Sequence, residues 1–435
     1  MNYLDMMQNS IDYIEKNLKS ELSAYELAEN AGFSLFHYYR LFQSVVGMPI
    51  MQYILKRKLC NAIYEISLGK KIIDVALSYG FETHSGFFKA FKRQFHCSPT
   101  YYLKKYKAVK PYKINLKQEA CIMITDKKLK EVLTHWELNE PVEIKDLYYK
   151  SSGNKSENTW LVNDDFTIKV GTNITGLNHH IILSKSLAKA GLETAIPVPT
   201  KDKNDYFIDG DLYFCLTNHI KGECLKSGEM YEGNFQSKAR HLGEIIGQLH
   251  LILQKQDKEV ICNEPNLYET IKDWAIPEVK KYITIPNSFY EDYLENFEKL
   301  YVCLPKHIIH RDPNPSNIIM EDGRLAGFID FELSERNIRI FDPCYAATAI
   351  LSESFAENDY NKLQKWLAIF KNIIIGYDSV CKIFDEEKQA IPYVIYSIQI
   401  MCVAYFSSMD KYVDLSKVNQ KMLMWLLDNR DSLMI

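Results

Sequence analysis

The segment HRDPNPSN, residues 310–317, holds the side chains of this 435-residue chain that are best suited to catalysis. Asp312 and Asn317 stand five residues apart in it, and a second carboxylate, Asp330, follows thirteen residues later in FIDFE. A carboxylate can accept the proton of a hydroxyl group, and carboxylate and amide oxygens are hard ligands that Mg²⁺ takes together with phosphate oxygens and water. These residues therefore predict phosphoryl transfer, with Asp312 as the base and Asn317 and Asp330 as metal ligands.

The chain around these residues must fold so that they meet. The stretch IIMEDGRLAGFID predicts a hairpin with its turn at residues 322–323, which returns Asp330 to Asn317. Upstream, NTWLVNDDFTIKVGT predicts another hairpin with its turn at residues 164–165. Its second strand contains Lys169, which is either a solvent-facing strand residue or the cation that binds nucleotide phosphates.

With these motifs, residues 121–435 resemble the aminoglycoside phosphotransferase and choline kinase group of small-molecule kinases. The resemblance implies a two-lobed α+β kinase-like fold, with a first lobe and hinge at residues 121–222 and a second lobe at residues 223–435. It implies that ATP or GTP binds with Mg²⁺ and that a hydroxyl group of a small molecule is phosphorylated. The cofactor-binding residues that it implies are Ser152, Gly153 and Asn158 near the nucleotide-covering loop, the phosphate-binding Lys169, and Asn218 in the hinge Phe214–Gly222.

Two positions differ from the pattern of that group. Arg311 follows the motif His, where most members have Gly, and we interpret it as a buried structural cation. In NHHIILSKSLAKAG, His180 stands where the group has the Glu that pairs with the phosphate-binding Lys. Glu193 or a shifted register is an alternative source of that carboxylate. Asp342 in RIFDPCY matches a structural residue that holds the loop after the metal site.

Two stretches at the front of the chain share one pattern at an offset of 48 to 50 residues. They are ELAENAGFSLFHYYRLFQSVVGMPIMQYI and DVALSYGFETHSGFFKAFKRQFHCSPTYYL. The period indicates two copies of one helical unit, and each copy predicts helix, glycine turn and helix, which is the plan of a helix-turn-helix. Ser23, with Glu26 three residues later, predicts a capping box at the first of these helices.

The helix after each turn has an apolar face, with Leu41 and Phe42 in the first copy and Phe87 and Phe91 in the second. On these motifs, residues 8–106 resemble the DNA-binding domain of the AraC/XylS family of bacterial transcription regulators. The resemblance implies an all-α tandem helix-turn-helix domain whose two helices enter successive major grooves of double-stranded DNA. It implies base contacts from Arg40, His84, Ser85 and Lys89, contacts of Phe36 and Tyr39 to thymine methyl groups or sugars, and phosphate contacts from Lys56, Arg57, Lys92 and Arg93.

The charge distribution predicts a polyanion partner for the front alone. Residues 1–110 carry 15 Lys/Arg and 9 Asp/Glu, a net charge of +6, whereas residues 111–435 carry 37 and 47, a net charge of −10. We expect the DNA-binding domain at residues 1–107 and a Lys-rich linker at residues 108–120.

Composition gives three further expectations. No apolar run reaches the length of a bilayer span, so we expect no membrane partner. The first residues lack the basic end and apolar segment of an export signal, which predicts a cytoplasmic protein. The ten cysteines include no CxxC pair and no metal-ligand spacing, so we expect buried free thiols.

Two functions stay open on these residues. In the first, a transcription regulator carries a working small-molecule kinase, which the intact Asp312, Asn317 and Asp330 favour. In the second, the kinase-like domain is a catalytically silent ligand sensor that controls the DNA-binding domain, which the replacement at His180 favours. Phosphorylation of a protein is less favoured, because the segment between Asp330 and Asp342 is too short for a regulated activation loop.

Overall fold

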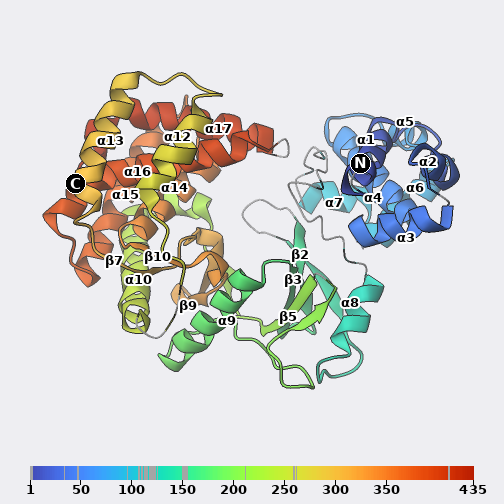
Figure 1. Ribbon diagram of the computed structural model, residues 1–435, viewed down its shortest axis with the longest axis horizontal. Helices are drawn as coiled ribbons and strands as arrows, with labels where there is room; N and C mark the ends of the chain where they lie inside the picture. The colour runs from blue at the N-terminus through green and yellow to red at the C-terminus, as the bar shows by residue number, and fades with distance from the viewer. Residues whose placement is uncertain are drawn as a thin grey trace. The chain divides into compact units, whose positions relative to one another are not determined.

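The computed structural model describes residues 3–33, 35–46, 49–95, 97–105, 108, 111, 116, 124, 126–148, 155–210, 212–257, 260, 262–409 and 412–435. The chain divides into two compact units (Figure 1). The first unit comprises Met1–Thr172 and Val198–Leu216, and the second comprises Asn173–Pro197 and Thr217–Ile435.

The front of the first unit is helical. Its helices are α1 (Tyr3–Lys16), α2 (Ala24–Asn30), α3 (Leu35–Val46), α4 (Ile50–Ser67), α5 (Ile72–Ser78), α6 (His84–Phe95) and α7 (Pro99–Lys105). Their apolar faces form one core, whose fully buried aromatic side chains are Tyr38, Phe42, Tyr53, Phe87 and Phe91. The two copies of the sequence repeat correspond to α2–α3 and α5–α6, with α4 between them.

Both turns of the repeat have the same backbone hydrogen bond. Gly32 and Gly80 have φ of +74° and +82°, a conformation that glycine adopts without steric cost. The N–H groups of Phe33 and Phe81, directly after each glycine, donate to the carbonyl five residues earlier, at 2.9 and 3.0 Å. This is the bond that closes a Schellman motif at a helix end. Ser23 accepts from the N–H of Glu26 at 3.2 Å and so caps α2, which is one of the two bonds of the predicted capping box.

The predicted phosphate contact of Arg57 is wrong, because this side chain is only 7% exposed. Its guanidinium binds both carboxylate oxygens of Glu15, at 2.6 and 2.8 Å, and the Tyr53 hydroxyl donates to the same carboxylate at 2.8 Å. Burial alone would lower the pKa of Arg57, but Glu15 holds it above its ordinary value. Arg57 therefore joins α4 to α1 as a buried ion pair. In the predicted linker, Leu116 is buried in the same core and donates its N–H to the side chain of Gln8.

The remainder of the first unit is a helix and an antiparallel sheet with a separate core. Its elements are α8 (Asp126–Leu133), β1 (Ile144–Tyr148), β2 (Lys155–Val162), β3 (Phe166–Gly171), β4 (Phe207–Asp209) and β5 (Leu212–Asn218), in the strand order β1-β2-β3-β5-β4. The predicted hairpin is β2–β3, with Val162 paired to Phe166. Its turn comprises residues 163–165, which include the two predicted residues and Asn163 before them, and Asn163 and Asp164 are at positive φ. Asn tolerates this conformation better than most residues.

The second unit contains helices and two small sheets, in the strand orders β6-β8-β9 and β10-β7. Its elements are α9 (Ile174–Lys189), β6 (Glu223–Cys224), η1 (Ser227–Tyr231), α10 (Phe235–Gln256), α11 (Leu267–Thr270), η2 (Ile271–Ala275), α12 (Ile276–Val279), α13 (Asn287–Tyr301), β7 (Lys306–Ile309), η3 (Pro315–Asn317), β8 (Ile318–Glu321), β9 (Arg324–Phe328), η4 (Phe331–Leu333), β10 (Glu335–Ile338), α14 (Phe341–Ser354), α15 (Tyr360–Val380), α16 (Asp385–Ser407), α17 (Val413–Asp428) and η6 (Arg430–Leu433).

Helices α10 and α15 cross in close contact. A Cβ atom at Gly243 would overlap the carbonyl oxygen of Ile373, and one at Gly376 would overlap that of Arg240. Only glycine permits this approach of two backbones. The crossing places the C-terminal half of α10, with His250, against the loop that is described in the next section.

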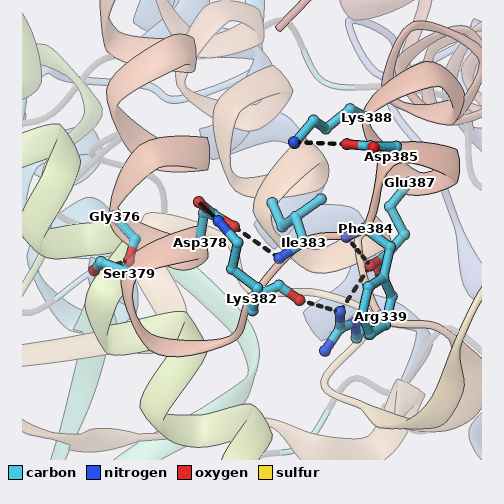
Figure 2. A network of polar contacts seen from close by, with 10 residues as sticks. All are labelled: Arg339, Gly376, Asp378, Ser379, Lys382, Ile383, Phe384, Asp385, Glu387 and Lys388. Carbon is cyan, nitrogen blue, oxygen red and sulfur yellow. Dashed lines mark hydrogen bonds and ion pairs between the residues drawn. The ribbon is translucent and has the colours of Figure 1, made fainter.

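A buried ion pair fixes the chain before α14 (Figure 2). Arg339 donates to both carboxylate oxygens of Glu387, at 2.8 and 2.7 Å, and Glu387 is fully buried near the start of α16. The same carboxylate accepts the N–H of Phe384 at 2.9 Å. Because Arg339 precedes Asp342 by three residues, this network holds the entry to α14 against α16.

Helix α16 is long and apolar enough to cross a membrane by length and composition, the one such helix in the part of the chain that the structure describes. However, 72% of its apolar window is buried inside the structure, as in the core helix of a globular domain. The nine cysteines among the described residues are free thiols, as expected, but their burial differs from the expectation. Only Cys215, Cys344 and Cys381 are buried, and Cys303 is exposed; Cys121 lies outside the described residues.

Candidate active site

The loop after β7 and the hairpin β8–β9 bring the predicted catalytic residues of the second unit together. The hairpin turn lies at residues 322–323, as the sequence predicts, and both residues have positive φ, 49° and 75°, as in a type I′ turn. At the other end of the hairpin, Ile329 donates its N–H to the carbonyl of Asn317 at 3.1 Å. The hairpin therefore returns the chain to Asn317 one residue before Asp330.

Two side chains hold Asp312. Nδ2 of Asn317 donates to the backbone oxygen of Asp312 at 2.9 Å and to its Oδ2 at 3.2 Å. The hydroxyl of Tyr345, on α14, hydrogen-bonds to the same carboxylate, a partner that the sequence did not reveal. Burial is the main cause that raises the pKa of the Asp312 carboxyl, and the negative charge of Asp330 acts in the same direction. A carboxylate with a raised pKa is a better base for a hydroxyl proton.

The donor set fits magnesium. Because Nδ2 of Asn317 is committed to Asp312, Oδ1 is the atom of this amide that can bind a cation, and Asp330 supplies a carboxylate. Among the residues with a described position, no three His, Cys, Asp or Glu side chains form a metal cluster. A site with one carboxylate and one amide is nevertheless typical for Mg²⁺, which completes its shell with phosphate oxygens and water.

Asp342 holds the loop before Asp312, and the prediction that it holds the loop after the metal site is wrong. Its fully buried carboxylate accepts the N–H groups of His310 and Arg311, at 2.8 and 3.0 Å, and the Nε2 proton of His250 at 2.9 Å. Burial would raise the pKa of Asp342, but these hydrogen bonds and the His250 charge bring it below its ordinary value. Asp342 therefore positions the backbone that leads into the catalytic loop.

His307, on β7, gives this region a pH dependence. Its ring packs edge-on against His250, with centroids 4.8 Å apart, and burial together with the charge of His250 lowers the pKa of His307 to about 4. The unfolded chain takes up the proton near pH 6.5, whereas the folded chain does not, so stability is lost as the pH falls from 6.5 towards 4.

We expect the free energy of unfolding to fall by about 2 kcal/mol more between pH 7 and pH 5 in the wild type than in His307→Gln, which has no proton to bind there. Urea unfolding of both proteins at the two pH values measures this difference. An equal loss in both would show that His307 is not the group that titrates.

Arg311 has the positive φ, 74°, that explains why Gly is usual at this position. Its side chain compensates for the strain. Nε lies 2.7 Å from a carboxylate oxygen of Glu335, and the guanidinium lies 4.0 Å from the ring centroid of Phe341. The side chain is half-buried rather than buried, and these contacts give it the structural role that was predicted from the sequence.

His180 is 7% exposed and faces the segment after Asp330. One ring nitrogen lies 3.1 Å from the carbonyl of Ala195, and the other accepts the N–H of Phe331 at 3.3 Å. The side chain of Glu193, the alternative carboxylate, is exposed. Its backbone carbonyl accepts the N–H of Phe328 at 3.3 Å.

The remaining predicted cofactor residues lie on other elements. Lys169 is in β3, paired with Thr159, and Asn158 is a half-buried residue of β2 rather than of a loop. Asn218, at the end of β5, uses its side-chain amide to bond Ile196 and Thr194, which fixes the hinge to the segment after α9. Ser152 and Gly153 lie outside the described residues.

The predicted DNA-facing side of α6 is exposed. Phe87 and Phe91 are fully buried, whereas His84, Ser85 and Lys89 are exposed, as the helical pattern predicted. Lys92 and Arg93 at the end of the same helix are also exposed.

Helix α3 packs differently from the prediction. Tyr38 and Phe42 are fully buried, while Leu41 and Tyr39 are half-buried against the core. The inward stripe is therefore shifted relative to the predicted one, and Tyr38 was missed. The side chains of Phe36 and Arg40 lie outside the described part of the chain.

Comparisons with known proteins match both the helical front of the chain and its kinase-like remainder. A family model described as a helix-turn-helix domain matches residues 27–105, and one described as a phosphotransferase enzyme family matches residues 180–373. The transcriptional activator AarP of Providencia stuartii is 37% identical over 91 residues, which are 21% of this chain and 67% of AarP. The chain belongs to the AraC-type helix-turn-helix family.

Another relative of this AraC-type chain is YbfP of Bacillus subtilis (strain 168), described as an uncharacterized HTH-type transcriptional regulator. It is 37% identical over 103 residues, 23% of this chain and 35% of YbfP. The chain thus spans about a third of the length of that relative.

The rest of the AraC-type chain has the fold of small-molecule kinases. A microcompartment-associated aminopropanol kinase superposes with a TM-score of 0.52, 14% identity, and coverage of 70% of this chain and 98% of the kinase. The GDP complex of aminoglycoside 2'-phosphotransferase-IIIa superposes with a TM-score of 0.51 and 14% identity, and the match covers 70% of this chain and 98% of that enzyme. At this identity the likeness establishes the fold alone, and residues 180–373 within it are those that match the phosphotransferase enzyme family model.

Proposed function

We propose that this chain is a sequence-specific, DNA-binding transcription regulator of the bacterial cytoplasm that carries a small-molecule kinase. The kinase-like domain would bind ATP or GTP with Mg²⁺ and transfer a phosphoryl group to a hydroxyl of a small molecule. The observation that carries the kinase activity is the mutual arrangement of Asp312, Asn317 and Asp330. The side-chain amide of Asn317 donates to Asp312, and the backbone carbonyl of Asn317 accepts the N–H of Ile329, the residue before Asp330.

Each residue has a separate role in this proposal. Asp312 accepts the proton of the attacking hydroxyl, for which its raised pKa is suited. Asn317 and Asp330 hold the metal, which neutralises phosphate charge when it is bound. The residues proposed to bind the nucleotide are Lys169, Ser152, Gly153, Asn158 and Asn218.

Structures with the same fold suggest which nucleotide and which hydroxyl acceptor to test first. One structure with the same fold is an aminopropanol kinase, and two structures of an aminoglycoside phosphotransferase hold GDP, in one case together with kanamycin. Aminopropanol and kanamycin both carry amine and hydroxyl groups. We therefore propose amino alcohols as the first acceptors to test, with both ATP and GTP as donors.

The DNA-binding activity is supported by the exposed face of α6 and by the net charge of +6 on residues 1–110. Residues of an exposed recognition helix can read base edges, while cationic residues at its end meet phosphates. We propose His84, Ser85 and Lys89 for the first role, and Lys92 and Arg93 for the second. We propose that α3 enters the adjacent major groove, with contacts to DNA from Phe36, Tyr39 and Arg40.

Substitution of Lys89 tests this assignment. We expect Lys89→Ala to weaken binding to the selected site by about 1–3 kcal/mol and to relax the base preference at one position. Lys92→Ala, the matched control, should weaken binding to all sequences equally and reduce the salt slope by about one. Selection of bound duplexes from a random pool, followed by titration at two salt concentrations, measures both. An unchanged preferred sequence in Lys89→Ala would remove Lys89 from the base readers.

A silent ligand sensor is the second candidate, and two observations favour it. His180 replaces the carboxylate that the kinase group usually has and bonds to Ala195 and Phe331. The hydroxyl of Tyr345 hydrogen-bonds to Asp312, where an acceptor hydroxyl would bind. In this alternative the kinase-like domain binds a nucleotide or small molecule and changes the affinity for DNA without turnover.

A further inference from the structure

Asp330 has an unusual backbone. Its φ of 65° and ψ of 60° are left-handed, a region that most residues with side chains avoid and that Asp enters more readily than most. Contacts of the neighbouring residues stabilise this conformation, and it sets the direction of the carboxylate. The bonds to the neighbouring peptide groups therefore decide whether Asp330 can bind a metal.

Ile329, the residue before Asp330, is held through both its backbone N–H and its backbone carbonyl. Ile329 donates its N–H to the carbonyl of Asn317 at 3.1 Å, and its own carbonyl accepts from Nε2 of His310 at 3.0 Å. Both partners belong to the catalytic loop. These two bonds explain the position of Ile329, but they leave the peptide after Asp330 to another partner.

That partner is His180. Phe331 donates its N–H to Nδ1 of His180 at 3.3 Å, and Nε2 of the same ring lies 3.1 Å from the carbonyl of Ala195. A peptide N–H can only donate and a carbonyl can only accept, so the ring is neutral with its proton on Nε2. His180 therefore joins the peptide after Asp330 to the segment that follows α9.

A glycine in helix α9 allows the helix to lie close to the segment after Asp330. Gly176 lies four residues before His180, on the same side of the helix, and a Cβ there would come within 3.1 Å of the carbonyl oxygen of Glu332. After the helix, Thr194 forms a parallel bridge with Phe328. The chain therefore contacts residues 328–332 at three points, and the imidazole provides the one that is next to Asp330.

We propose that His180 is a positioning residue for the metal ligand Asp330. By accepting the Phe331 N–H, it holds Asp330 in the left-handed conformation in which the carboxylate binds magnesium. This role rests on the proposed magnesium-nucleotide binding of the second unit. A buried histidine that only filled space would not affect metal binding.

Calorimetric titration with the non-hydrolysable nucleotide AMP-PNP, in Mg²⁺ and in EDTA, tests the role in the full-length chain. We expect His180→Leu to weaken binding in Mg²⁺ by about 10–100-fold, the range for residues that support metal ligands, with no change in EDTA. His180→Gln retains an acceptor and a donor and should stay close to wild type. His179→Leu, the neighbouring half-buried histidine, is the matched control and should bind as wild type does.

Nitrogen NMR of the histidine rings gives a second readout, because the wild type should show His180 as the neutral Nε2–H form. Equal affinities of His180→Leu and wild type in Mg²⁺ would overturn the role of His180 alone. Equal weakening in Mg²⁺ and EDTA, or failure of His180→Gln to restore binding in a folded protein, would also overturn it. A wild type that binds no better with Mg²⁺ than with EDTA would overturn the proposed function itself, and this role with it.

Discussion

Asp312→Asn is expected to lower phosphoryl transfer by roughly 10²–10⁴-fold, the usual contribution of a general base. The substitution has the same shape as Asp and keeps the backbone oxygen that accepts from Asn317 at 2.9 Å. It removes the negative charge of the side chain and with it the ability to take the hydroxyl proton. The loss should therefore appear in turnover, while the affinity for the nucleotide changes little.

Transfer of labelled phosphate from ATP or GTP to a panel of amino alcohols measures the effect. Asp322→Asn is the matched control, because Asp322 is an exposed residue at a positive φ of 49° in the hairpin turn, which Asn also adopts. Its turnover should equal that of the wild type. Unchanged turnover in Asp312→Asn would mean that another group is the base.

The same variant separates the two candidate functions. A working kinase would convert the small molecule into its phosphorylated product in the wild type but not in Asp312→Asn. If the product and its precursor differ in their effect on DNA binding, the same small molecule should shift the DNA affinity of the two proteins differently. A silent sensor should respond equally in both proteins, because no step depends on the base. No transfer by the wild type to any acceptor, with equal ligand-dependent DNA binding in both proteins, would favour the sensor.

Features that depend on short stretches of sequence could be predicted. The turn at residues 322–323 follows from Asp-Gly between two apolar strands, and this turn directs the chain back towards Asn317. The repeated glycines at 32 and 80 likewise specify two equivalent helix ends. Both halves of the architecture were visible because these local signals recur in order along the chain.

Features that depend on packing between distant segments could not be predicted. Tyr345 meets Asp312 only because α14 begins beside the catalytic loop. Arg57 looked like a phosphate contact, and Glu15, 42 residues away, gives it a buried partner instead. In α3 the predicted burial of Phe42 is confirmed, but Tyr38 is buried with it instead of Leu41.

Asp342 shows how a correct residue can receive a wrong role. Its type and position indicated a buried structural carboxylate, which it is. Which peptide groups it holds depends on where β7 ends relative to α14, and this contact spans about 30 residues of chain. The sequence contains no local signal for that pairing.

Asp330→Ala is expected to abolish magnesium-dependent nucleotide binding. The substitution removes the only carboxylate that is proposed to bind the metal. Its effect should exceed the roughly 10–100-fold loss that is typical when a residue merely supports a metal ligand. The fold should survive, because the neighbouring bonds to Asn317, His310 and His180 use the backbone of Ile329 and Phe331.

Calorimetric titration of the wild type and Asp330→Ala with MgATP is therefore the most direct measurement of the central claim, with Asp322→Ala as the control for loss of an exposed carboxylate in the same hairpin. We expect saturable binding by the wild type and the control, and none by Asp330→Ala. Equal binding by all three proteins, or no binding by the wild type to either MgATP or MgGTP, would contradict it.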